Sequence, residues 1–161
     1  MRTTRMLAVL ASIAVVGNCS DSTSSNIPEG LEVYTATLNG ANERPTAITT
    51  AATGHATVTI LGDSLISWEV VIDSPIDSIT AGHIHRFNPD TGFGGVILSL
   101  APPARGLDFI GTATTGSAPP VPAPPALTDS TFAIIRAGRG YVNIHTRVNG
   151  GGEIRGNLVR Q

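Results

Sequence analysis

The stretch GYVNIHTRVNGGGEIRGNLVR, residues 140–160, carries the clearest fold signal in this chain. Apolar and polar residues alternate on both sides of NGGG (149–152), and a period of two is typical of half-buried β-strands. Glycines tolerate the positive φ angles of tight turns, so the two halves are expected to form an antiparallel hairpin. The apolar side chains that could face a core are Val142, Ile144, Ile154 and Leu158.

The same alternation recurs along the chain and predicts an all-β protein. Turn sequences such as LGDS (61–64), NPDTG (88–92) and RAGRG (136–140) separate the segments. No helical periodicity of useful length follows the apolar N-terminal run, so we expect strands only. Many short strands with regular turns favour a sandwich or a barrel. The expected strands are 32–39, 55–62, 65–73, 78–87, 94–100, 109–116, 132–138, 140–148 and 153–160.

The first thirty residues have the layout of a secretory signal followed by a polar linker. Two arginines precede an apolar run, which ends near Cys19, the only cysteine of the chain. A lone cysteine at this place resembles a bacterial lipoprotein signal, in which the cysteine carries the lipid. Ordinary cleavage nearby, leaving a free thiol, is the alternative. We expect a signal at 1–19 with lipidation at Cys19, a linker at 20–30, and one domain at 31–161, exported and anchored to a membrane of the cell envelope.

Composition restricts the partners of the exported domain. Removing residues 1–19 takes away two arginines and leaves eight against twelve acidic residues, a net charge of −4, and the chain has no lysine. Nucleic-acid binding needs a concentrated basic face, so nucleic acid is not an expected partner. The proline-rich SAPPVPAPPA (117–126) is expected to be a stiff surface connector rather than a strand.

Three longer motifs identify a family resemblance. LNGANERPTAITTAATGHATVTI (38–60), GHIHRFNPDTGFGGVI (82–97) and GYVNIHTRVNGGGEIRGNL (140–158) follow one another in this order. Together they resemble the CHRD domain, which is named for its repeats in animal chordin and also occurs in bacterial exported proteins. The resemblance implies an antiparallel β-sandwich, an immunoglobulin-like or Cu/Zn superoxide dismutase-like Greek key. It implies little about activity, although chordin itself binds growth factors outside the cell.

Histidine is scarce, and three of the four histidines fall in the last two motifs. His83 and His85 are two residues apart in an expected strand, so their side chains point to the same side. His145 shares a face with Asn143 in the next motif, and the hairpin brings Glu153 near it. Imidazoles suit copper and zinc, so His83, His85, His145 and Glu153 are a candidate metal site.

A structural role is the competing interpretation of the same residues. The histidines, together with Asn143, Glu153 and Arg155, could form a hydrogen-bonded network that fixes the register of adjacent strands. No nucleophile elbow, phosphate-binding loop or dinucleotide fingerprint is present, and we expect no enzyme. The sequence therefore predicts an envelope lipoprotein that acts as a binding or scaffold module for an envelope protein or an extracellular ligand. The alternative function is copper or zinc binding, with modest redox activity.

Overall fold

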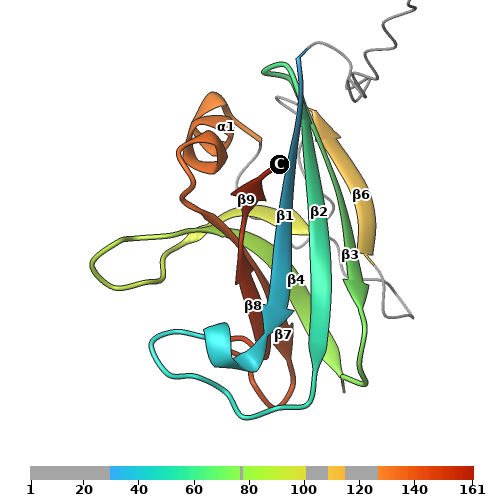
Figure 1. The fold of residues 1–161 in the computed structure, drawn as a ribbon, viewed down its shortest axis with the longest axis vertical. Helices are drawn as coiled ribbons and strands as arrows, with labels where there is room; N and C mark the ends of the chain where they lie inside the picture. The colour runs from blue at the N-terminus through green and yellow to red at the C-terminus, as the bar shows by residue number, and fades with distance from the viewer. Residues whose placement is uncertain (1–29, 77, 101–108, 115–126) are drawn as a thin grey trace, which may run out of the picture.

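The computed structural model describes residues 30–76, 78–100, 109–114 and 127–161 (Figure 1). The expected signal with Cys19, the linker up to residue 29 and the connector 117–126 lie outside the described residues. In this described part no helix is both long and apolar enough to cross a membrane. The elements are β1 (Leu31–Asn39), the 3-10 helix η1 (Gly40–Asn42), β2 (Thr53–Leu61), β3 (Leu65–Ile72), β4 (Ile79–Arg86), β5 (Val96–Leu100), β6 (Phe109–Thr114), α1 (Asp129–Arg136), β7 (Gly140–Thr146), β8 (Ile154–Asn157) and β9 (Val159–Arg160).

The strands form one antiparallel sheet in the order β5-β4-β7-β8-β1-β2-β3-β6, with β9 paired to β1. The sheet curls until β5 and β6 approach each other, which gives a nearly closed barrel. Figure 1 shows β1, β2, β3 and β6 along one side and β4, β7 and β8 along the other. The predicted all-β antiparallel fold is confirmed, and the two walls of its core are parts of one continuous sheet.

The core follows from the alternation read in the sequence. In β2, Ala56, Val58 and Ile60 are buried and alternate with more exposed neighbours. Trp68 of β3 is also buried, in a strand with the same alternating pattern. Because successive side chains of a strand point to opposite faces, each strand contributes one apolar row. These rows meet inside the barrel in one hydrophobic cluster.

The hairpin predicted at 140–160 is confirmed. β7 pairs antiparallel with β8, and Ile144 lies opposite Ile154. Both isoleucines are fully buried, and Leu158 is only 3% exposed, so the predicted core face is correct. The expected strand 153–160 is divided into two short strands, because β9 pairs with β1 rather than continuing along β7.

The strand predicted at 132–138 is wrong, and so is the expectation of strands only, because Asp129–Arg136 forms the helix α1. Thr131, Phe132 and Ile135 are buried, as expected for residues three and four apart on one helix face. Phe132 and Ile135 join the core cluster, and Figure 1 shows α1 at one end of the barrel. An apolar run as short as FAII fits a buried strand and a helix equally well, so its pattern could not decide between them.

Candidate functional site

The polar side of β7 faces away from the barrel core but is nevertheless buried. Tyr141, Asn143 and His145 alternate with core-facing neighbours, yet every residue of β7 is buried. Two loops lie over or beside this side, the one from η1 to β2 (residues 43–52) and the one from β4 to β5 (residues 87–95) (Figure 1). A polar layer between sheet and loops is therefore largely shielded from water without belonging to the core, with the β7 residues buried and His83 and His85 half-buried.

The three histidines named from the sequence come together in this layer. Pairing of β4 with β7 places His83 opposite Asn143 and Ala81 opposite His145. The ring centroids of His83 and His145 are 4.9 Å apart. The centroid of His85 lies 5.4 Å from that of His83 and 5.6 Å from that of His145. One ring nitrogen from each histidine lies within 4.8 Å of the others, an arrangement that could hold a metal ion.

Backbone carbonyls determine which nitrogen of two imidazoles carries the proton. Nδ1 of His85 lies 3.0 Å from the carbonyl oxygen of Gly94, and Nδ1 of His145 lies 3.1 Å from that of Gly150. A carbonyl only accepts, so both Nδ1 atoms must donate, which leaves Nε2 with a free lone pair in the neutral ring. Such outer hydrogen bonds commonly orient metal-binding histidines.

Three buried ring nitrogens have no hydrogen-bond partner within the described part of the chain. They are Nδ1 of His83 and Nε2 of His85 and His145. Buried polar atoms are normally paired, and an unpaired one costs free energy. Nε2 of His85 and of His145 are acceptors in the neutral rings, and a single metal cation between the three rings is one partner that could satisfy all three nitrogens.

The environment keeps these imidazoles neutral. Burial, together with the neighbouring imidazoles of His145 and His85, lowers the pKa of His83 to about 4. Burial also lowers the pKa of His85 and of His145, although the hydrogen bond to Gly94 or Gly150 acts in the opposite direction. The neutral ring is the form that binds a metal, so the group is ready to act as ligand at neutral pH.

The histidine group is wider than a metal-bound one. Nitrogens that share a tetrahedral metal with bonds of 2.0–2.1 Å lie about 3.4 Å apart. The largest separation, 4.8 Å, would have to contract by about 1.4 Å when a metal binds. Three histidines would leave a fourth position open for solvent or another ligand.

A stack of three side chains extends from the histidines across the sheet. The ring of Tyr141 is 5.0 Å from that of His85 and nearly parallel to it, and the guanidinium of Arg155 lies 3.5 Å from the Tyr141 ring centroid. Because β7 lies between β4 and β8, His85 and Arg155 approach Tyr141 from opposite sides. The tyrosine thus separates the histidines from the arginine.

Glu43 belongs to the polar layer and was not found by sequence reasoning. It is 3% exposed, and its Oε2 accepts a 3.4 Å hydrogen bond from Nδ2 of Asn143. Burial raises the pKa of Glu43 to about 7, although the charge of Arg155 and the bond from Asn143 act against this. A single glutamate in the motif NGANERP gave no signal, because only the folding of its loop brings it to β7.

The other predicted residues make different contacts. Glu153 accepts hydrogen bonds from Thr146 and Asn149 and is not part of the three-histidine group. Arg155 donates to the carbonyl oxygen of Gly92. In the described residues neither Glu153 nor Arg155 forms an ion pair. No hydrogen bond joins the histidines to the predicted network partners there.

Comparison with known proteins agrees with the family resemblance. A family model described as the CHRD domain matches residues 34–158. No curated protein and no solved structure matches the chain. The matched residues include all three histidines and both covering loops, so the whole polar layer lies within the family domain.

Proposed function

Because this chain belongs to the CHRD domain family, we propose that it is a binding module of the cell envelope whose three-histidine site holds one copper or zinc ion. The CHRD domain is consistent with a binding or scaffold role. Export and lipidation at Cys19 would place the domain on a membrane surface, as the layout of residues 1–19 suggests.

One observation carries the metal proposal: three neutral imidazoles, one buried and two half-buried, each have a buried nitrogen without a hydrogen-bond partner in the described residues, and the three rings lie side by side. A network that merely fixes strand register would use these nitrogens in hydrogen bonds to protein. Copper and zinc both accept imidazole nitrogen, and neither needs a carboxylate at the site. When bound, the metal would supply a Lewis-acidic or, for copper, a redox-active centre with an open position.

The residues around the histidines would support such a site. The carbonyls of Gly94 and Gly150 hold two rings in the required tautomer, and Tyr141 packs against the face of His85. Both carbonyls belong to loops, one before β5 and one in the turn before β8. Metal binding should therefore also order the loops at this end of the polar layer.

The test is the metal content of the full chain purified without chelators. We expect about one copper or zinc per chain by elemental analysis. Replacing His83, His85 or His145 by alanine should remove the metal, whereas His55→Ala should retain it. His55 is the matched control because it is exposed and its Nδ1 lies 3.1 Å from Asp73, outside the histidine group. Wild-type protein that stays metal-free after incubation with either metal would refute the proposal.

A further inference from the structure

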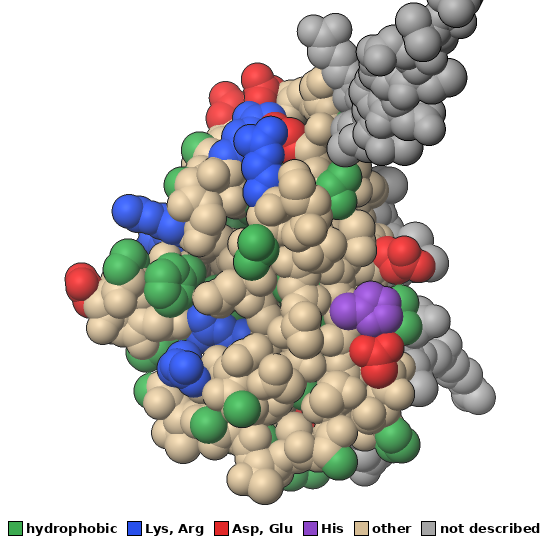
Figure 2. Space-filling view, viewed as in Figure 1, with side chains coloured by type: hydrophobic (Ala, Val, Ile, Leu, Met, Phe, Trp, Pro, Cys, Tyr) green, Lys and Arg blue, Asp and Glu red, His purple; other side chains and the backbone are tan. Residues whose placement is uncertain are grey.

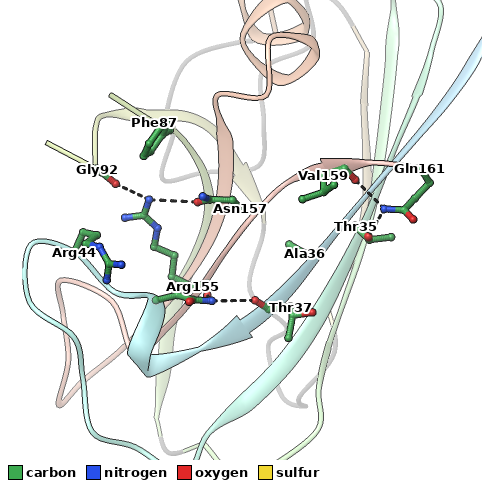
Figure 3. A pocket seen from close by; sticks show the side chains of 11 residues that line it. Thr35, Ala36, Thr37, Arg44, Phe87, Gly92, Arg155, Asn157, Val159 and Gln161 are labelled. Carbon is green, nitrogen blue, oxygen red and sulfur yellow. Dashed lines mark hydrogen bonds between the residues drawn. The ribbon is translucent and has the colours of Figure 1, made fainter. Parts of the chain in front are cut away.

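A second candidate site lies on the outer side of β1, β8 and β9. It is a pocket of about 680 Å³, enclosed on two further sides by the loop after η1 and the loop after β4 (Figure 3). This volume lies within the range of about 300–1,000 Å³ that is usual for small-molecule sites. None of the three histidines lines it.

Arg155 forms the inner wall of this pocket. The residue is only 3% exposed, and its guanidinium donates to the carbonyl oxygen of Gly92 and, at 3.5 Å, to Oδ1 of Asn157 (Figure 3). Its Nη1 is buried without a hydrogen-bond partner in the described part of the chain. A buried arginine is almost always paired with an anion, yet in that same part Arg155 has no ion pair.

Glu43 does not supply the missing negative charge. It influences Arg155 electrostatically but does not form an ion pair with it within the described residues. Its carboxylate bonds to Asn143 instead, and burial raises its pKa to about 7, so its charge is incomplete at neutral pH. The cation of Arg155 is therefore left for a ligand to balance.

A second guanidinium borders the same pocket. Arg44 lines it from the loop after η1 and is exposed. Burial lowers the pKa of Arg155, and the positive charge of Arg44 acts in the same direction. Nη1 of Arg44 donates to the carbonyl oxygens of Ala41 and Glu43, which hold the side chain in place. Figure 2 shows basic side chains between the two loops on this face, with the visible acidic ones toward its margins.

The remaining walls combine an aromatic ring with uncharged polar groups. Phe87 borders the pocket from the loop after β4, and Asn42, Asn157 and Gln161 bring amides to it. Thr35 adds a hydroxyl, which accepts a hydrogen bond from the Gln161 amide. An aromatic surface with several amides and hydroxyls suits a ligand that has an apolar ring face and many hydroxyl groups.

We propose that this pocket binds a sugar acid, with its carboxylate on the guanidinium groups of Arg155 and Arg44 and its ring over Phe87. The planar fork of arginine matches a carboxylate through two parallel hydrogen bonds. The amides of Asn42 and Asn157 then bind the ring hydroxyls. This ligand site is independent of the proposed metal site, because Tyr141 stands between Arg155 and His85.

The test is calorimetric titration of the chelator-treated full chain with galacturonate, galactose and inorganic phosphate at neutral pH. We expect one galacturonate per chain and at least tenfold weaker binding of galactose, which lacks the carboxylate, and of phosphate, which lacks the ring. Arg44→Gln should weaken galacturonate binding about tenfold, whereas Arg147→Gln should not change it. Arg147 is the matched control because it is exposed and does not line the pocket.

Arg155→Lys is a second variant that keeps the charge but loses the fork, and it should also weaken galacturonate binding. If it fails to fold, Arg44→Gln still decides, since Arg44 is on the surface. The proposal is overturned if galacturonate gives no saturable heat up to about 10 mM. Equal binding of galactose, or binding of phosphate alone, would equally overturn it. Because the titration contains no metal, its failure would leave the metal proposal unaffected.

Discussion

At the residue scale, burial shifts the pKa values of His85 and Glu43 and so sets their protonation states. His85 is ordinary by sequence, but its burial lowers its pKa, the carbonyl of Gly94 fixes its tautomer, and Tyr141 packs on its ring. The pKa of Glu43 is raised instead, because burial disfavours the charged form of both groups, which is the deprotonated form of a carboxyl and the protonated form of an imidazole. At neutral pH, burial therefore keeps the His85 imidazole in its neutral form and leaves the Glu43 carboxyl only partly ionised.

The sequence predicted part of this site. The rule that residues i and i+2 share a strand face was enough to place His83 beside His85, and the similar motif suggested His145 as their neighbour. Glu43 could not be found in this way, because its position depends on the course of a loop. Nor could strand alternation predict the contacts of Glu153, whose carboxylate accepts hydrogen bonds from Asn149 in the adjoining turn and from Thr146 at the end of β7.

Replacing Glu43 by glutamine should change how stability depends on pH. The folded-state pKa of Glu43, about 7, lies above its ordinary 4.5, so its contribution to stability is complete below about pH 4.5 and is lost as pH rises through 7. When the pH is raised from 5 to 8, the unfolding free energy of Glu43→Gln should therefore rise by about 1–3 kcal/mol relative to that of the wild type.

Urea unfolding of wild type and Glu43→Gln at both pH values measures this difference. Glu69→Gln is the control, since Glu69 is exposed on β3, and it should leave the pH dependence of the wild type nearly unchanged. If the unfolding free energies of Glu43→Gln and wild type differ by the same amount at both pH values, the pKa of Glu43 is not raised in the folded protein.

At the element scale, the alternation of β-strands was predictable and the helix was not. The hairpin of β7 and β8 has long alternating halves and a glycine-rich turn, so one pairing register buries its apolar residues. In α1, Phe132 and Ile135 became core residues through packing against the barrel end. Arg136 then pairs with Glu32 and Asp63, residues distant in sequence that local patterns cannot foresee.

Ile144→Ala tests the assignment of the two faces of β7. Ile144 is fully buried in the core, so removing its side chain should cost about 2–5 kcal/mol of unfolding free energy. Val148→Ala is the control, because Val148 is 79% exposed just beyond the same strand and should change stability by less than about 0.5 kcal/mol. Similar small losses for both variants, measured by denaturant unfolding, would contradict the assigned core face.

At the scale of the whole molecule, a barrel with its own core carries a polar layer on its outer side. The hydrophobic cluster inside the sheet stabilises the fold, so the polar residues of the outer layer are not needed for the core and can serve in binding. Within that layer the histidines and the arginine-lined pocket are neighbours separated by Tyr141. The proposed metal ion and the proposed sugar acid would therefore lie on neighbouring parts of the outer surface, the first on β4 and β7 and the second on β1, β8 and β9.

Cys19→Ser tests the proposed attachment of the domain to a membrane. If Cys19 carries a lipid, the wild-type protein should sediment with membranes and have the mass of an acylated chain, whereas the serine variant should be soluble or uncleaved. Ser20→Ala keeps the cysteine and should behave as wild type. Wild-type protein found wholly in the soluble fraction, with its N-terminus cut elsewhere, would contradict the anchor.

Thermal unfolding of the chelator-treated full chain with and without copper or zinc tests the three-histidine site most directly. A metal at a hundredfold excess over its dissociation constant adds about 2.7 kcal/mol, which for a chain of this size raises the midpoint by about 5–10 °C. We predict this rise for the wild type and for His55→Ala, and none for the double variant His83→Ala/His85→Ala. An unchanged wild-type midpoint with both metals, or an equal rise in the double variant, would contradict the account.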